Sequence, residues 1–310
     1  MNPVFNNLRK SLYFVFDRIV GALGGYEHFH RVFEIAEFTG ALRNNLGYVG
    51  GSSKKEYLHA IARSFPEKSP GDCNRILKDF WKEHQRIFLE LFMYSEMKQD
   101  NIEHLVDFKG LHHLDRALAR GGGAILPVPH FGNVRLLHYA LALKGYPLAV
   151  VSSEYSDDPE IVRRFKLEET SQVQKVGFRG QNPKWIMAAL KDNHLLQIAS
   201  TAEAGAAGVE VDFLQRKLFL SSGWVRFALT TGALILPTYI LRNPDNRQMV
   251  EILPELPLNE GKNRSETIRL TAASLLCLYE PIYRRNPHLI DWMSWMVRLK
   301  EAREHFGNGV

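Results

Sequence analysis

A histidine stands at the point where a buried strand is expected to end and a helix to begin. Residues 121–133 read Gly-Gly-Gly-Ala-Ile-Leu-Pro-Val-Pro-His-Phe-Gly-Asn, so His130 follows an apolar run. In open α/β sheets, ligands bind beyond the carboxyl ends of the strands. Because imidazole readily accepts a proton near neutral pH, this position predicts a general base at His130; a purely structural histidine is the alternative.

A second group suited to chemistry is an arginine between two glycines. The segment 176–180 ends a predicted strand, and its glycines let the backbone turn so that Arg179 presents its guanidinium to a phosphate. An ordinary surface turn would explain the same residues. Five further histidines lie in helical patterns without a partner at ligand spacing, and we expect them to be structural or exposed: His28, His30, His112, His113 and His138.

These groups must be positioned by a core in which short apolar runs alternate with helical patterns from about residue 111 onward. Such alternation is typical of βαβ units and predicts an α/β fold with a mixed, largely parallel central sheet flanked by helices. We expect strands at 124–128, 148–152, 195–199, 234–239 and 249–253. Helices are expected at 111–120, 133–144, 183–192 and 222–231, followed by a long helix over about 263–285 and a helical tail over 292–305.

The N-terminal segment carries apolar side chains at helical spacing over residues 4–23, interrupted by Arg9, Lys10 and Arg18. This pattern fits an amphipathic helix that lies in the headgroup region of an anionic bilayer. It fits a helix packed on the protein's own core equally well.

A helical lead-in is expected to follow, with helices near 27–46 and 71–93. The second carries an aromatic stripe, which is more often core than acyl groove: Phe80, Trp81, Phe88 and Phe92. An acyl chain beside His130 would still need an apolar groove, and the N-terminal helices are its natural wall. We expect a single domain over 1–310, made of an amphipathic helix (1–25), the helical lead-in (26–110) and an α/β catalytic-type core (111–310).

Composition restricts the partners. The formal net charge of +5 and pI near 9.1 favour an acidic partner, such as anionic lipid, an acidic carrier protein or a phosphorylated substrate. No Lys/Arg run or zinc-finger spacing accompanies the charge, so nucleic acid is not expected. Cys73 and Cys277 indicate neither a disulfide scaffold nor a zinc site, and neither a secretory signal nor a membrane span is recognised. We therefore expect a cytoplasmic protein.

The string from His130 to Asn133 after a glycine-rich strand resembles the H-x4-[D/E] motif of the lysophospholipid acyltransferase superfamily, in particular its lipid A late (lauroyl/myristoyl) acyltransferase branch. Other stretches resemble this branch in the same order along the chain: 208–223, 227–237, Pro287 and Trp292. The resemblance covers roughly residues 1–296.

In that family the histidine takes a proton from a hydroxyl or amine, which then attacks an acyl thioester. The resemblance implies His130 as this base, with acyl-CoA or acyl carrier protein as co-substrate and no cofactor or metal. The family's acid five positions on is replaced here by Arg135. Loss of the orienting acid from a comparable triad costs about 10⁴ in rate. A nearby cation penalises proton uptake further, by ~4 kcal/mol at 4 Å and an effective dielectric near 20.

Three explanations of Arg135 stay open. Another carboxylate could replace the missing acid, and Glu154 and Glu203, each beyond the end of a predicted strand, are the best placed. Arg135 could point away or bind a substrate phosphate or carboxylate. Alternatively, the protein could bind acyl groups without transferring them. We favour a replaced acid or an altered substrate.

The sequence therefore predicts an acyltransferase that moves an acyl group to a hydroxyl or amine of a lipid or specialised metabolite. Its expected location is the inner face of the cytoplasmic membrane, as a peripheral protein. The substrate-binding residues are predicted to be Phe131, Gly132, Asn133, Arg135 and Arg179. The alternative function is that of a catalytically impaired relative that binds acyl or lipid ligands as a scaffold or sensor.

Overall fold

A computed structural model describes residues 14–45, 48–49, 52–152, 173–177, 183–201 and 208–296. Its first third is mostly helical. Residues 14–22 form a helix. The elements that follow are η1 (Gly25–His28), α2 (Phe29–Asn45), β1 (Tyr48–Val49), β2 (Ser52–Ser53), α3 (Lys54–Ser64), α4 (Pro70–Glu90), η2 (Leu91–Glu96) and η3 (Ile102–His104).

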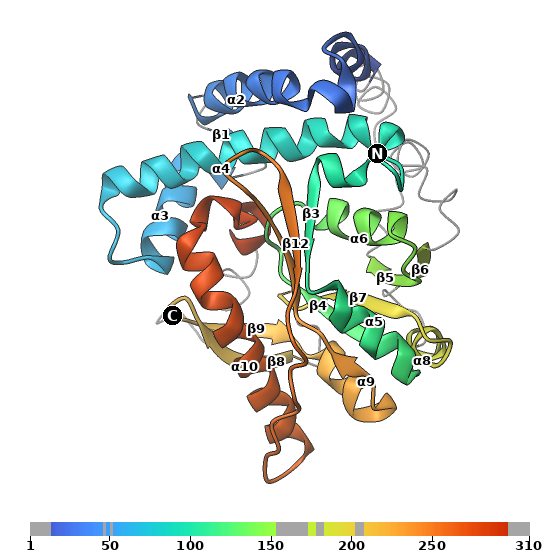
Figure 1. Ribbon diagram of the computed structural model, residues 1–310. Helices are drawn as coiled ribbons and strands as arrows, with labels where there is room; N and C mark the ends of the chain where they lie inside the picture. Colours follow the sequence, from blue (N-terminus) through green and yellow to red (C-terminus); the bar gives the residue numbers. More distant parts are fainter. Residues whose placement is uncertain are drawn as a thin grey trace, which may run out of the picture.

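Residues 69–72 form the capping motif that begins α4. Ser69 accepts a hydrogen bond from the backbone of Asp72, the Asp72 carboxylate bonds back to the Ser69 backbone, and Pro70 occupies the first helical position. Helices α2 and α4 lie side by side across one end of the molecule (Figure 1). A Cβ on Gly40 of α2 would stand 2.6 Å from the Cα of Lys82, so glycine permits this close approach.

The central sheet confirms the predicted α/β class. Its five strands run in the order β10 (Leu234–Ile235), β4 (Ala124–Val128), β7 (Leu195–Ala199), β5 (Leu148–Ser152) and β6 (Val173–Gly177), and every neighbouring pair is parallel. The flanking helices are α5 (Leu111–Arg120), α6 (Val134–Leu143), α8 (Lys184–Lys191) and α9 (Gly223–Thr231). All residues of β4 are buried, as expected for a parallel strand covered on both faces.

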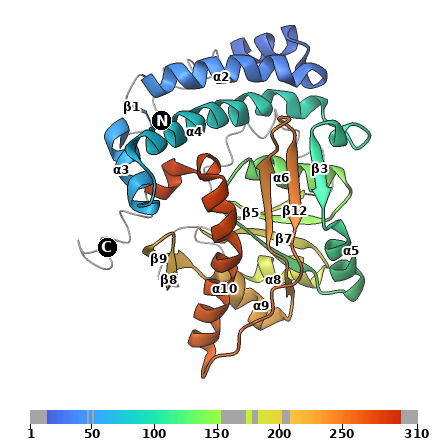
Figure 2. The ribbon, with the colours of Figure 1, turned by 60° about the vertical axis from the view of Figure 1, so that its left-hand side comes forward.

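The prediction of one strand over 234–239 was wrong in one respect: the segment contributes to two strands that belong to different sheets. β10 ends at Ile235, and after Pro237 the chain enters β11 (Thr238–Arg242) in a three-stranded sheet with β12 (Gln248–Ile252) and β3 (Val106–Lys109). Pro237 has no N–H to donate to a ladder, which suits the change of sheet. Figure 2 shows β12 and β3 rising towards α4.

Further elements complete the core. β8 (Gly208–Phe213) and β9 (Arg216–Ser221) form an antiparallel hairpin that the sequence analysis did not anticipate. Helix α10 (Arg264–Arg285), η5 (Pro287–Leu289) and a helical stretch over 292–296 follow the second sheet. Across the described residues, no helix combines the length and apolarity needed to cross a bilayer.

Candidate active site

His130 lies two residues beyond β4, at the carboxyl end of the central sheet, and lines a cavity of about 440 Å³. The cavity is bounded by three parts of the chain: α4, the turn at 130–135, and the segment 288–294. The wall formed by α4 and the first residue of η2 is largely apolar, with Phe80, Ile87, Phe88 and Leu91. A mostly apolar cavity next to a histidine can hold an acyl chain with its reactive end at the imidazole.

The aromatic stripe of α4 and η2 contacts both the core and the cavity. Trp81 and Phe92 are packed inside the protein. Phe80 is buried and Phe88 is half-buried, and both line the cavity. Phe88 also meets Phe16 of the helix at 14–22 edge to face, with ring centroids 5.1 Å apart. The stripe therefore contacts both the interior and the cavity.

The turn after His130 is held by main-chain contacts with the C-terminal segment. The N–H of Gly132 donates to the carbonyl of Leu289 at 2.9 Å, and the N–H of Asp291 donates to the carbonyl of His130 at 3.2 Å. Gly132 has φ +63, and a Cβ there would clash with the carbonyl oxygen of Ile240. The shape of the turn thus requires glycine at this position.

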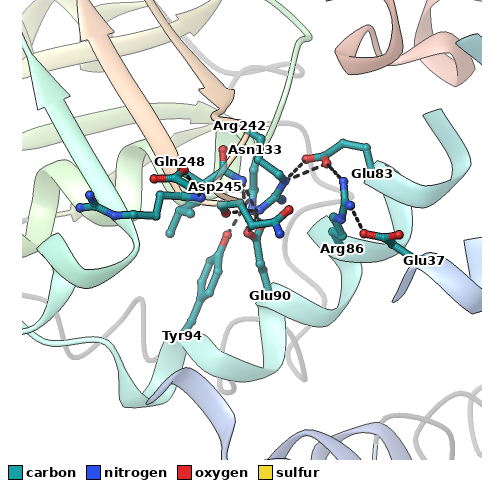
Figure 3. Close-up of polar contacts among 12 residues, drawn as sticks. Glu37, Glu83, Arg86, Glu90, Tyr94, Asn133, Arg242, Asp245 and Gln248 are labelled. Atoms are coloured by element: carbon teal, nitrogen blue, oxygen red, sulfur yellow. Dashed lines mark hydrogen bonds and ion pairs between the residues drawn. The ribbon is translucent and has the colours of Figure 1, made fainter. Parts of the chain in front are cut away.

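Asn133 caps α6 and joins the turn to a buried polar network (Figure 3). Its Oδ1 accepts from the backbone N–H of Leu136 at 3.1 Å and from the hydroxyl of Tyr94 at 3.2 Å. Its Nδ2 donates to Oε2 of Glu90 at 2.6 Å. Burial, with the nearby Glu90 charge, holds the pKa of Tyr94 well above its usual range, so this hydroxyl stays a donor.

A buried ion triad forms the rest of the network. Arg242, at the end of β11, donates from Nε to both carboxylate oxygens of Glu83 at 2.8 Å and from Nη1 to Glu90 at 2.8 Å. Gln248 donates to the same Glu90 at 3.2 Å. These three charged side chains are at most 4% exposed. The triad ties α4 to the second sheet and, through Asn133, to the turn that carries His130.

A hydroxyl contacts the His130 ring. Thr201, two residues beyond β7, has its Oγ1 3.0 Å from Nδ1 of His130 and accepts the His130 backbone N–H at 3.0 Å. No sequence pattern singles out Thr201. Only the side-by-side pairing of β4 with β7 brings these positions together, and that pairing cannot be read from spacing.

The predicted site residues fall into two groups. Phe131, Gly132, Asn133 and Arg135 line the cavity with His130; Phe131 is buried and stacks on Tyr283, and Arg135 is exposed. Glu154, Arg179 and Glu203 lie outside the described residues. Their roles, and substrate contacts by the first group, stay predictions.

In the C-terminal segment, two titratable residues of the cavity were not anticipated. Burial lowers the pKa of His288, which favours its neutral form, while the charge of Glu83 acts in the opposite direction. Asp291 accepts hydrogen bonds from the backbone and hydroxyl of Ser294 at 3.2 and 2.5 Å. The bonds between residues 289–291 and the turn at 130–132 explain why the C-terminal segment reaches the site.

Comparisons with known proteins identify the family of this chain. The family model described as bacterial lipid A biosynthesis acyltransferase matches residues 13–276. The protein is thus an enzyme of the acyltransferase class. More specifically, the chain belongs to the bacterial lipid A biosynthesis acyltransferase family, which confirms the resemblance found in the sequence.

Curated relatives carry the same class name. A phosphatidylinositol mannoside acyltransferase of Mycolicibacterium smegmatis (strain ATCC 700084 / mc(2)155) is 25% identical over 265 residues, which cover 83% of this chain and 84% of that protein. Proteins of the same name from Mycobacterium tuberculosis strains CDC 1551 / Oshkosh and ATCC 25618 / H37Rv are 27% and 26% identical over 159 residues, half of each chain.

Proposed function

We propose that this enzyme moves an acyl group from a CoA or acyl carrier protein thioester to a lipid hydroxyl, with His130 as general base. The observation that carries the proposal is the position of His130. It lies two residues beyond the end of β4 and lines a largely apolar cavity, in a chain that belongs to an acyltransferase family. An amine acceptor would be handled by the same chemistry.

The reaction needs one proton relay. His130 takes the proton of the acceptor hydroxyl as the oxygen attacks the thioester carbonyl carbon. The new C–O bond forms, the C–S bond breaks, and the imidazolium returns the proton to the departing thiolate. Positioned general bases of this kind contribute about 10² to 10⁴ in rate.

A carboxylate is expected to balance the imidazolium in place of the acid lost at Arg135. Glu203 is the first candidate, because it follows by two residues the Thr201 that contacts His130. Glu154 is the second. If Glu203→Gln kept the full rate while Glu154→Gln lost it, the assignment would pass to Glu154.

Arg135 is proposed to bind an anionic part of a substrate. It occupies the first turn of α6, where a cation faces the positive end of the helix dipole and gains no helix stability. It is exposed and lines the cavity. A guanidinium so placed can bind a phosphate of the thioester donor or of the lipid headgroup bidentately. Arg179 is proposed to serve the same purpose.

The acceptor is proposed to be a phospholipid with hydroxyl groups on its headgroup. The support is the name of the relatives, phosphatidylinositol mannoside acyltransferase. A lipid A precursor is the second acceptor to test, because of the family.

A peripheral location on an anionic membrane is proposed for the N-terminal helices. Phe14 and Val15 on the first described helix and Phe38 and Leu42 on α2 are exposed, from 48% for Val15 to 71% for Phe38. Exposed apolar side chains of this size suit the headgroup boundary of a bilayer. Phe38→Asp with Leu42→Asp should reduce sedimentation with anionic vesicles; unchanged sedimentation would exclude α2 from the membrane contact.

The proposal is tested by following a radiolabelled acyl group from palmitoyl-CoA and palmitoyl-acyl carrier protein into extracted lipid. The acceptors are mannosylated phosphatidylinositol, a lipid A precursor and a lysophospholipid. His130→Ala should abolish label transfer, whereas His112→Ala, an exposed histidine on α5, should not. Acyl-ligand binding without transfer to any acceptor would favour the non-catalytic alternative, and transfer that survives His130→Ala would refute the assignment of the base.

A further inference from the structure

The backbone beyond β7 continues the strand pairing as far as His130. Val128 of β4 lies opposite Ala199 of β7, and the N–H of Ser200 donates to the carbonyl of Val128 at 2.8 Å. The next residue, Thr201, then accepts the His130 backbone N–H at 3.0 Å and has the same oxygen 3.0 Å from Nδ1 of the ring. Thr201 is 1% exposed, so this hydroxyl meets the ring away from bulk water.

One oxygen atom therefore meets two nitrogens of His130. A hydroxyl has one hydrogen to donate and two lone pairs to accept with. The His130 backbone N–H can only donate, so it uses one lone pair. The second lone pair can accept from Nδ1–H, which leaves the lone pair of the ring on Nε2.

This tautomer is the one that a base acting through Nε2 requires. The bond from Nδ1–H to Thr201 is the same before and after Nε2 takes a proton, so proton uptake needs no rearrangement at Thr201. In the opposite tautomer Nε2 already holds a hydrogen and accepts none. The hydrogen bond made by one ring nitrogen thus sets the role of the other.

We propose that Thr201 is a positioning residue: it fixes the orientation and the Nδ1–H tautomer of His130, so that Nε2 takes the acceptor's proton. This inference rests on the proposed function of His130 as base. A neutral hydroxyl orients the ring without balancing the imidazolium charge, so Thr201 complements a carboxylate and does not replace it.

The first test needs no catalysis. Nitrogen-15 NMR of ring-labelled histidine in the whole protein reports which nitrogen is protonated, and the His130 signals are assigned by their loss in His130→Gln. Above the pKa of the ring, the proposal predicts a protonated Nδ1 in the unmodified protein and a mixture of tautomers in Thr201→Val. A protonated Nε2 in the unmodified protein would overturn it.

The second test is kinetic and uses four variants. Thr201→Val removes the hydroxyl and should lower kcat about ten- to hundredfold, the effect of one hydrogen bond of roughly 1.4 to 2.8 kcal/mol, with KM within about twofold. Thr201→Ser keeps the hydroxyl and should retain most of kcat. Ser200→Ala is the matched control, because among the described residues the Ser200 hydroxyl donates to the Val128 carbonyl, which already accepts the Ser200 N–H. His130→Ala reports on the base itself.

The outcomes separate the two proposals. Loss of activity in His130→Ala with an unchanged kcat in Thr201→Val overturns the role of Thr201 and leaves the proposed function standing. Full activity in His130→Ala overturns the proposed function, and the role of Thr201 with it. If Thr201→Val does not fold, the tautomer measured in the unmodified protein and the kcat of Thr201→Ala decide the matter.

Discussion

Replacing Arg242 by methionine should be among the most destabilising single changes in this protein. The substitution removes the only positive charge that contacts Glu90 within the described network, and with it the Nε–H that both oxygens of Glu83 accept. Both carboxylates are at most 3% exposed, so in a medium of low dielectric Glu90 would keep only its neutral donors Asn133 and Gln248, and Glu83 only the more distant Arg86 at 3.4 Å. Breaking such a buried pair costs about 3–5 kcal/mol. This is a large part of the 5–15 kcal/mol typical of a folded domain.

Urea unfolding followed by circular dichroism measures this cost. With an m-value of about 3 kcal/mol per molar, the midpoint should fall by roughly 1 to 1.7 M. Arg284→Met is the matched control, because its pair with Glu280 is 2.6 Å long but about one-third exposed on both sides. Such a surface pair contributes at most about 1 kcal/mol. Equal midpoints for the two variants would refute the view that burial makes the triad critical.

The pH dependence of the same variant checks the electrostatic reasoning. Burial raises the pKa of Glu83, but the charge and hydrogen bonds of Arg242 more than offset this, so the pKa lies below its ordinary value. In the unmodified protein this contribution is complete above the ordinary carboxyl pKa and is lost as the pH falls through the lowered one. In Arg242→Met burial dominates and the folded-state pKa should rise above the unfolded value. The stability deficit should therefore shrink between pH 7 and pH 5, and a deficit that grows with acid would contradict this.

Two further substitutions test the scaffold. Gly132→Ala should abolish turnover, because it places a side chain at a positive φ and in a clash with the carbonyl of Ile240. In the control Gly145→Ala, the new Cβ would meet nothing within 4 Å, so this variant should lose only the backbone strain of about 1–3 kcal/mol in stability. Tyr279→Phe removes a buried hydroxyl that accepts from the Thr238 N–H at 3.1 Å and donates to a β4 carbonyl. In urea titrations the free energy of unfolding should fall by about 1–3 kcal/mol. A change below about 0.5 kcal/mol would show that water replaces these bonds.

Local patterns were enough to predict much of the core. The strand at 124–128 is an apolar run bounded by glycines and by the proline before His130, and the structure has it with the same limits. The helix at 111–120 was likewise predicted with its observed bounds. Each of these two elements is specified by residues within it or directly beside it, so its prediction does not require knowledge of which distant parts of the chain it pairs with.

The elements that were not predicted depend on backbone conformations, or on contacts with distant residues, that the residue types do not indicate. The β8–β9 hairpin turns at Leu214 and Gln215, both with positive φ, although neither is a residue that favours this conformation. Glu83 and Glu90 stand seven residues apart on α4 and resemble a solvated helix face. They are buried only because Arg242 arrives from a strand about 150 residues later. The contact of Thr201 with His130 similarly requires the pairing of β4 and β7.

The most direct test of the account is thioester consumption by the purified protein with acyl-CoA or acyl carrier protein and a hydroxylated phospholipid, compared with His130→Ala. The account predicts turnover in the unmodified protein that depends on the acceptor and falls at least a hundredfold in the variant, while the two proteins unfold at the same urea concentration within about 0.3 M. Equal turnover in both proteins would contradict the assignment of His130 as the catalytic base.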